Sequence, residues 1–524
     1  MTAGVTKNDF VVEVDGIEIP EDEKMQLTDT REIQELDFLI VGAGISGINM
    51  SYRFQQHFPG KSYVVLEQRE QIGGTWDLMR YPGIRSDSDL HTFGFAWRPW
   101  EEKEPIAEGY KILKYMNESA AMYGIDKKIL FKHKVLEAKW QSRQQAWTLV
   151  VEAIGADGLT TIKYFRAPFL IMGTGYYDYS TPLKAKIPGL SDFKGAIAHP
   201  QFWPQDLDYS NKKIAVIGSG ATAITLIPAL AQKAAKVSMV QRSPTYVVGF
   251  PNRTNRRRWW EWLLPDSWFH WLTRMRYLIG GIFMRRFFSD PVRARAFVAK
   301  LTKKELPEHI KFDPHFVPRY DPWTQRMCFC PDNDFFKALH NGNTDVVTGV
   351  IKTVMEDRIV MENGQEIEAD IIVTATGLKM QYGGNTTMTI DGEKLNWGSK
   401  FLWRGVMISD VPNMAIVQGY TKASWTLGAD ATASMVMRLM KHMHRKGITA
   451  ATPRVKDADE KLKQLVHAPA LMGLTSTYIL TALHRLPKNT KETPWAPRGN
   501  YLWDMFDSRF ADLSKGMQFT MAAR

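Results

Sequence analysis

The sequence predicts an α/β fold that contains two strand–helix–strand units and a helical insert. Two apolar strands, in DFLIV and in KKIAVI, are each followed by a glycine-rich turn and a largely apolar helix. A further segment at 255–288, dense in Trp, Phe and Arg, follows the second unit. Because a strand, a glycine turn and a helix in that order form the start of a Rossmann-like domain, we predict two Rossmann-like dinucleotide-binding domains.

The first unit carries the pattern G-x-G-x-x-G directly after its strand, as Gly42, Gly44 and Gly47. The first glycine allows the tight turn, the second lets the backbone approach a pyrophosphate, and the third lets helix and strand pack closely. Free N–H groups at the start of the helix favour bound phosphate. The next strand ends at Glu67, whose carboxylate can accept hydrogen bonds from ribose hydroxyls.

The second unit carries the variant G-x-G-x-x-A, as Gly218, Gly220 and Ala223. Its second strand ends with Arg242 and Ser243 in place of an acid. A guanidinium beside a hydroxyl suits a 2′-phosphate, because it binds phosphate in a forked, charge-assisted way. We therefore predict that the first unit binds FAD and the second binds NADPH.

Strand and glycine patterns also divide the chain. VVEVDGIEI is a candidate hairpin near the N-terminus, and the strands that end in GTGYY and ATGLKM are expected to connect the domains. The predicted parts are an N-terminal extension at 1–36, a first part of the FAD domain at 37–180, a linker at 181–210, an NADP domain at 211–375 with a helical insert at about 250–315, and a second part of the FAD domain at 376–524.

Composition limits the functional classes without selecting one. The chain has 524 residues and a formal net charge of +11, which suits phosphate-bearing cofactors, an anionic membrane surface or nucleic acid. Its N-terminus lacks a basic region followed by an apolar run, and no uncharged apolar run reaches the roughly 18 residues that span a bilayer. A cytoplasmic protein is expected.

The two cysteines, Cys328 and Cys330, are spaced C-x-C. A disulfide between such neighbours would be strained, and two thiols alone cannot hold zinc, so we predict reduced thiols and no metal site. A disulfide reductase would need a different cysteine spacing near the flavin. Molecular oxygen is the acceptor that remains.

A segment between the two glycine loops, FKGAIAHPQFWP, matches the pattern F-x-G-x-x-x-H-x-x-x-W-[PD] through Phe193, Gly195, His199, Trp203 and Pro204. The chain thereby resembles type I Baeyer–Villiger monooxygenases, which are class B flavoprotein monooxygenases, over roughly 37–500. GGTWDLMRYPGIRSDSD and GYTKASWTLGAD are most similar to the ethionamide-activating subgroup. The resemblance implies a hinge role, and no catalytic role, for the segment.

The resemblance implies two sets of cofactor ligands. Those expected at FAD are Gly42, Gly44, Ser46, Gly47, Glu67, Gly74, Thr75, Trp76, Asp77, Tyr81, Asp87 and Val135. Those expected at NADP are Arg85, Ser86, Gly218, Ser219, Gly220, Ala221, Thr222, Ala223, Arg242 and Ser243.

The resemblance also implies the catalytic residues. Arg326 corresponds to the arginine that stabilises a negatively charged C4a-peroxyflavin, and a guanidinium keeps its charge at any working pH. Asp87 corresponds to the aspartate that orients this arginine. Many relatives have Lys-Arg where this chain has Gln325-Arg326, which shifts the grip on the 2′-phosphate to Arg242 and Ser243.

The implied activity is NADPH-dependent insertion of one oxygen atom of O2 into ketones, giving esters or lactones, with sulfide oxidation as a side activity. Lipophilic or long-chain ketones are the expected substrates. Two alternatives stay open: a flavin-containing monooxygenase acting mainly on sulfur or nitrogen, and a non-catalytic nucleotide-binding protein associated with membranes.

The aromatic and basic segment at 255–288 can form amphipathic helices with Trp, Leu and Phe on one face and Arg on the other. That pattern suits peripheral contact with a membrane surface, and it equally suits a cap packed on the body or the rim of an apolar substrate entrance. No nucleic-acid-binding module is evident, so nucleic acid is not expected as a partner. Monomer and dimer both remain open.

Overall fold

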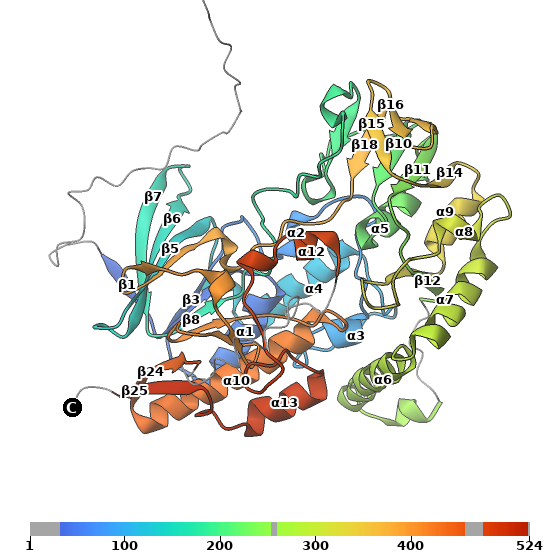
Figure 1. Ribbon diagram of the computed structural model, residues 1–524. Coiled ribbons are helices and arrows are strands. Elements are labelled where there is room, and N and C mark those ends of the chain that lie inside the picture. The colour runs from blue at the N-terminus through green and yellow to red at the C-terminus, as the bar shows by residue number, and fades with distance from the viewer. Residues whose placement is uncertain (1–31, 253–258, 456–474, 522–524) are drawn as a thin grey trace, which may run out of the picture.

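The computed structural model describes residues 32–252, 259–455 and 475–521 (Figure 1). The candidate hairpin in VVEVDGIEI and most of the predicted N-terminal extension lie outside these residues. The last part of that extension forms β1 (Ile33–Glu35), which pairs in parallel with β7 (Thr160–Ala167).

The first glycine loop belongs to a seven-stranded sheet of order β21-β22-β23-β8-β2-β3-β4. The strands from β23 to β4 run parallel, whereas β21 and β22 form an antiparallel edge. The strands are β2 (Phe38–Val41), β3 (Tyr63–Leu66), β4 (Ile129–Leu130), β8 (Leu170–Met172), β21 (Leu402–Trp403), β22 (Met407–Ile408) and β23 (Met414–Ile416).

Both faces of this sheet are buried, so its central strands are continuously apolar. Alternation along β2 sends Phe38 and Ile40 to one face and Leu39 and Val41 to the other. The first face packs against helices, and the second packs against another sheet. The helices are α1 (Ile45–His57), α3 (Leu90–Phe93), α4 (Gly109–Met122) and α10 (Trp425–Lys446), and the short α2 (Thr75–Leu78) follows Gly74.

The second sheet of this domain is six-stranded, in the order β1-β7-β6-β5-β19-β20, and is mostly antiparallel. Trp140 and Trp147 on adjacent strands are fully buried where it meets the first sheet. Its remaining strands are β5 (His133–Gln141), β6 (Ala146–Ile154), β19 (Thr387–Ile390) and β20 (Glu393–Lys394). At the C-terminal end, β24 (Ile448–Pro453) pairs with β25 (Met517–Met521), and α12 (Thr477–Leu480) and α13 (Tyr501–Phe510) lie between them in sequence.

The second glycine loop belongs to a five-stranded parallel sheet of order β14-β11-β10-β18-β9. Its strands are β9 (Ala196–Ala198), β10 (Lys213–Ile217), β11 (Lys236–Gln241), β14 (Thr344–Thr348) and β18 (Ile371–Thr374). One face packs against α5 (Ala221–Leu230) and α9 (Asp334–His340), and the other against β15 (Ile351–Val354), β16 (Arg358–Met361) and β17 (Glu366–Glu368). The predicted linker at 181–210 thus supplies an edge strand, β9, to this sheet.

The helical insert leaves this domain after β12 (Val247–Phe250) and returns at β13 (Cys328–Pro331), which pair in parallel. Between them lie α6 (Asp266–Phe287), α7 (Pro291–Glu305) and α8 (Phe312–His315), preceded by a 3-10 turn at Trp259–Leu263. Both cysteines are free and buried on β13, and burial raises the pKa of Cys328 to about 12. Over the described ranges, no helix has both the length and the apolar character needed to cross a bilayer.

Candidate active site between the two nucleotide-binding units

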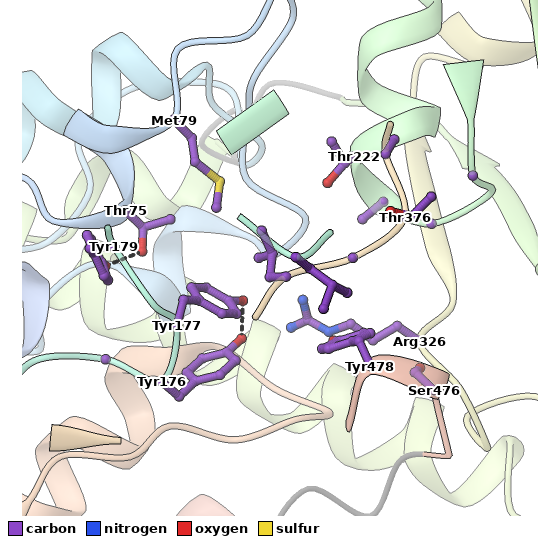
Figure 2. Close-up of a pocket in the computed structure, with 18 of the residues that line it drawn as sticks. Thr75, Met79, Tyr176, Tyr177, Tyr179, Thr222, Arg326, Thr376, Ser476 and Tyr478 are labelled. Carbon is purple, nitrogen blue, oxygen red and sulfur yellow. Dashed lines mark hydrogen bonds between the residues drawn. The ribbon is translucent and has the colours of Figure 1, made fainter. Parts of the chain in front are cut away.

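A cavity of about 1660 Å³ lies between the two domains and is lined by both glycine loops. Its walls come from residues far apart in sequence, including the C-terminal ends of β2, β8, β10 and β18, the loop before β13, and α12. Ligands of open parallel sheets bind at the carboxyl ends of the strands, so this position matches a dinucleotide site in each domain. Figure 2 shows Arg326 in this cavity, together with Tyr176, Tyr177 and Tyr478.

The first loop packs too tightly for any side chain at its third glycine. A Cβ on Gly47 would lie 1.9 Å from the carbonyl oxygen of Gly42, so the helix can approach the strand only with glycine there. The Glu67 carboxylate accepts hydrogen bonds from the backbone N–H of Ala43 at 2.6 Å and of Arg69 at 2.9 Å. Burial raises the pKa of Glu67, while these two donors act against the rise. Glu67 lines the cavity beside the loop.

The second loop begins with Gly218, whose φ of +137° lies in the region that favours glycine and whose added Cβ would lie 2.2 Å from the carbonyl oxygen of Ala375. Ser219 Oγ donates to the carbonyl oxygen of Ser243 at 3.1 Å, which ties the loop to the end of β11. Arg242 lines the cavity, and its Nη2 donates to Thr477 Oγ1 at 3.4 Å. The end of this strand therefore offers a cation next to a glycine loop.

Arg326 lies between the two loops and pairs with Asp87, with 3.2 Å between Nη1 and Oδ2. The Asp87 carboxylate raises the pKa of the guanidinium, so Arg326 stays charged at every working pH. In Figure 2 the guanidinium points toward the hydroxyls of Tyr176 and Tyr177, which are hydrogen-bonded to each other. Burial raises the pKa of Tyr177 and brings that of Tyr478 to about 12, so these phenols remain neutral donors.

Thr174 and Thr376 supply two buried side-chain hydroxyls that have no hydrogen-bond partner within the described ranges. Both line the cavity, and each belongs to a Thr-Gly pair just after a parallel strand, β8 or β18. Buried polar groups are normally satisfied, so two such hydroxyls at one cavity indicate a polar ligand. Together with the glycine loops and Glu67, they fit an FAD and an NADP that enter from the two domains.

The two connections between the domains meet at Asp178. Its buried carboxylate accepts a hydrogen bond from Lys379 at 2.7 Å and others from Ser180, Thr181 and Asn385. Burial alone would raise the pKa of Asp178, but these donors, Lys379 first, lower it well below the usual range. The segment that leaves the FAD domain near residue 178 is therefore bonded to the segment that returns to it near residue 379.

The fingerprint segment, which is residues 193–204 with the pattern F-x-G-x-x-x-H-x-x-x-W-[PD], lies outside the cavity lining. Gln201 Nε2 donates to the carbonyl oxygen of Asp178 at 2.6 Å, which ties the segment to the connection between the domains. His199 Nδ1 accepts from the Gln201 N–H at 3.2 Å, and its buried Nε2 has no partner among the described residues. Burial lowers the pKa of His199. Phe193 and Trp203 are buried in the cores on the two faces of the five-stranded sheet.

Most residues predicted at the cofactors line the cavity, and the exceptions have clear local roles. Asp77 is buried and forms ion pairs with Arg69 at 2.5 Å and Arg80 at 2.7 Å, so its carboxylate holds the loop before α2. Arg85 does line the cavity, and it also pairs with Asp334, with 3.1 Å between Nη2 and Oδ1. Those on the cavity are Gly42, Gly44, Ser46, Glu67, Gly74, Thr75, Trp76, Tyr81, Arg85, Asp87, Val135, Gly218, Ser219, Gly220, Ala221, Thr222, Arg242 and Ser243, and those behind it are Gly47, Asp77, Ser86 and Ala223.

Sequence reasoning missed the aromatic residues around Arg326. Tyr176 stacks on Trp425 with 5.0 Å between ring centroids, and Trp425 Nε1 donates to Ser46 Oγ at 2.9 Å. These contacts join the start of α10 to the first glycine loop. The sequence did contain a signal for two residues of the site. Tyr176 directly follows the Gly-Thr-Gly at the end of one apolar strand, and Thr376 belongs to the Thr-Gly at the end of another. Tyr478 carried none, because it follows a stretch without periodicity.

Comparisons with known proteins agree with this geometry. The family model described as flavin-binding monooxygenase-like matches residues 37–418. The FAD-containing monooxygenase EthA of Mycobacterium tuberculosis (strain ATCC 25618 / H37Rv) is 42% identical over 474 residues, covering 90% of this chain and 95% of that protein. The probable FAD-binding monooxygenase AlmA of Acinetobacter baylyi is 40% identical over 486 residues, covering 91% and 95%.

Solved structures show where this fold occurs. Cyclohexanone monooxygenase from Rhodococcus sp. Phi1, bound to NADP+, is similar with a TM-score of 0.70 at 20% identity, over 94% of this chain and 100% of that one. A steroid monooxygenase bound to NADP matches with a TM-score of 0.70 at 20% identity, over 93% and 100%. Identity this low shows the shared fold alone, whereas the family match extends over most of both glycine-loop domains. The chain belongs to the flavin-binding monooxygenase-like family.

Proposed function

We propose that this protein is an FAD- and NADPH-dependent Baeyer–Villiger monooxygenase that inserts one oxygen atom of O2 into ketones to give esters or lactones. The observation that carries the proposal is the Arg326–Asp87 pair, which lies in one cavity with both glycine loops. Family membership and the names of the relatives EthA and AlmA support flavin-dependent oxygenation. The Trp203-Pro204 ending of the fingerprint favours ketones over sulfur or nitrogen as the main target.

The cofactors would be held by residues of the two domains. FAD would be held by the first glycine loop, by Glu67 at the ribose and by the Thr174 and Thr376 hydroxyls. NADP would be held by the second loop, with Arg242 at the 2′-phosphate. Gln325 stands where many relatives have a lysine, and a cation in its place can come from other lysines that line the cavity; they are Lys184, Lys186 and Lys352.

Bound FAD, once reduced by NADPH, supplies the chemistry that activates O2 and delivers one oxygen atom. The side chains supply charge and position. Arg326 stabilises negative charge that develops on oxygen, and it needs no proton exchange to do so because Asp87 keeps it charged. The Tyr176 hydroxyl, which accepts a hydrogen bond from the Tyr177 hydroxyl, lies on the side toward which the guanidinium points, where its own hydrogen can be donated to the same oxygen.

The lining near Arg326 favours lipophilic ketones. Four aromatic residues line the cavity together with Arg326; they are Tyr176, Tyr420, Trp425 and Tyr478. An apolar chain gains free energy on leaving water for such surfaces, whereas a charged substrate would have to shed its hydration. We infer that ketones with long or bulky apolar substituents bind best.

The test compares Arg326→Ala, Arg326→Lys and, as a control, Arg143→Ala in an exposed turn. NADPH oxidation, hydrogen peroxide and ester are measured with cyclic, aryl and long aliphatic ketones and with an aryl sulfide. We expect Arg326→Ala to reduce ester formation by roughly 100-fold or more while NADPH is still consumed, as for loss of one oxyanion-stabilising group. Arg326→Lys should keep part of the activity. Ester formation by Arg326→Ala at the parental rate would refute the role, and sulfoxide without any ester would favour the sulfur-oxidising alternative.

We further infer peripheral membrane contact through the helical insert of an otherwise cytoplasmic enzyme. Trp268, Trp271 and Phe283 on α6 are exposed, although aromatic side chains of this size are usually covered. Arg285 and Arg286 in the last turn of the same helix are exposed as well, which suits the interface of an anionic bilayer. Flotation with liposomes tests this: Trp268→Ser with Trp271→Ser should lower the floated fraction, and a parent that does not float would disprove the contact.

A further inference from the structure

A second cavity, of about 870 Å³, lies between the C-terminal parts of α1, α10 and α13. It shares no lining residue with the cavity around Arg326, so neither cofactor nor substrate explains it. In Figure 1 these three helices gather on the side of the FAD domain that also carries the C-terminal strand pair. No residue of this site was singled out by the sequence patterns.

Basic side chains dominate the lining of this second cavity. They are Arg53, His57, Lys61, Arg438, Lys441, His444, Arg445 and Arg509, against the single carboxylate of Asp430. That carboxylate is already bonded to Arg53 at 3.0 Å, and Lys61 pairs with Asp37 at 2.9 Å. In the part of the chain that the structure describes, Arg438, Lys441, Arg445 and Arg509 form no ion pair. Among the described residues, the cavity therefore holds four cations that have no carboxylate within ion-pairing distance.

Helix dipoles account for only part of this charge. Lysine and arginine are common near helix C-termini, because each terminus carries roughly −0.5 of an elementary charge. Three such termini contribute about −1.5 in total, which leaves the four unpaired cations in excess by about two and a half charges. A phosphate group carries about −1.5 to −2 near neutral pH and would balance most of this excess.

The donors in the cavity also suit phosphate. Lys441, Arg445 and Arg509 are exposed at the rim and are free to turn inward, and two of them present planar guanidinium groups that can bind phosphate oxygens in pairs. Arg438 is partly buried, where it donates to the carbonyl oxygen of Ser508 at 3.2 Å. Burial lowers the pKa of His57, so this ring adds hydrogen-bonding capacity to the wall and little charge.

An exposed apolar stripe borders the cavity on α13. Leu502, Trp503, Phe506 and Phe510 recur at helical spacing, and Trp503 and Phe510 are 61% and 68% exposed. Met505, Ser508 and Arg509 of the same helix line the cavity. Arg285 near the end of α6 donates to the carbonyl oxygen of Gly499 at 2.7 Å, so the chain just before α13 contacts α6. Phosphate donors and an adjacent apolar surface together fit an amphiphile.

We propose that this cavity binds the phosphate headgroup of an anionic phospholipid at a membrane surface, with its acyl region against the stripe of α13. Charge complementarity selects the headgroup, and the stripe selects a lipid over a soluble phosphate ester. The proposal does not rest on the oxygenase activity, because the site is separate from the cavity around Arg326. It adds a specific lipid site to the general membrane contact of α6.

The experiment uses the full chain and vesicles of phosphatidylcholine with or without phosphatidic acid. The test variant is Lys441→Gln/Arg445→Gln/Arg509→Gln, and the control removes equal charge elsewhere as Lys127→Gln/Lys128→Gln/Lys337→Gln. We expect the parent and the control to bind vesicles with phosphatidic acid within about threefold of each other, and the test variant to bind roughly 100-fold more weakly. Binding of inorganic phosphate and glycerol 3-phosphate is measured by calorimetry in parallel.

A second test variant and a check of folding keep the result interpretable. Arg509→Glu alters only one exposed side chain near the end of α13, so it should fold, and it should still weaken vesicle binding several-fold. Thermal unfolding and NADPH oxidation of each variant report on folding and on the oxygenase separately. Vesicle binding by the test variant equal to that of the control would overturn the proposal. Binding of soluble phosphate without vesicle binding would likewise overturn it, by showing a site for a soluble ester.

Discussion

Replacing Asp178 by Asn should destabilise the protein more than any comparable change at its surface. The change keeps the shape of the side chain and removes its charge. Oδ1 would keep the bonds from Ser180 and Asn385, but the amide nitrogen that replaces Oδ2 cannot accept from Lys379 or Thr181, each now at 2.7 Å.

The magnitude follows from the bonds that are lost. A hydrogen bond to a charged group contributes about 1.5–3 kcal/mol, and the bond from Lys379 is one of these. Lys379 is 33% exposed and regains part of its hydration, which reduces the loss, whereas the Thr181 hydroxyl adds about 1 kcal/mol. We therefore expect a decrease of about 2–3 kcal/mol in the free energy of unfolding at pH 7.

The effect should also depend on pH. Because the folded state lowers the pKa of Asp178, its carboxylate contributes stability that is fully present above the unfolded pKa of about 3.9. That contribution is lost as the pH falls below this value toward the lower folded pKa. The difference between the parent and Asp178→Asn should thus be constant from about pH 5 to 7 and should shrink below about pH 4.

Urea unfolding followed by tryptophan fluorescence measures the difference, and hydrogen exchange at the Ser180 and Thr181 amides reports on the site itself. Asp192→Asn, an exposed residue in the following turn, is the matched control and should change stability by less than about 0.5 kcal/mol. The reasoning fails if Asp178→Asn unfolds like the control at pH 7, or if the difference is the same at pH 3 and pH 7.

Three further predictions concern the loops and the thiols. Gly47→Ala should abolish stable folding of the FAD domain, or lower the free energy of unfolding by at least about 3 kcal/mol, because the added Cβ would meet the Gly42 carbonyl. Gly280→Ala inside α6 is the control: it has open space around it and should be neutral or stabilise by up to about 1 kcal/mol. Differential scanning fluorimetry compares the two variants. Arg242→Ala should lower kcat/KM for NADPH by roughly 10- to 100-fold and leave that for NADH nearly unchanged; equal losses with both cofactors would speak against a 2′-phosphate contact. Cys328 and Cys330 should react with a thiol reagent only after unfolding, since both are buried and burial raises the pKa of each; rapid reaction of the native protein would contradict this.

Short sequence patterns predicted the strand–helix–strand units and the helices of the insert, because neighbouring residues determine these elements. The two glycine loops, their strands and the acidic or basic end of the second strand each fall within about 30 residues, so a single stretch of sequence identifies a strand–helix–strand unit. Glu67 and Arg242 lie beside their loops in the structure as that pattern requires. The aromatic insert likewise forms helices, because its helical spacing is local.

Contacts between distant segments could not be read in the same way. Asp178 and Lys379 are separated by 201 residues, and the cavity between α1, α10 and α13 joins segments from Arg53 to Arg509. Asp77 shows the same dependence on its surroundings, because its neighbours in the motif line the cavity while its own carboxylate pairs with Arg69 and Arg80. A motif specifies backbone path well, and side-chain direction depends on charges that the motif does not contain.

The order of strands in the seven-stranded sheet has a consequence for biosynthesis. The central strand β8 pairs on one side with β2, which belongs to the same first part of the FAD domain, and on the other with β23, where Leu170 faces Met414. The whole NADP domain is translated between these two partners. A nascent chain must therefore hold one apolar strand edge open while an entire domain emerges from the ribosome and folds. We expect this interval, and not the chemistry of the flavin, to determine how much the protein depends on chaperones when it is overproduced.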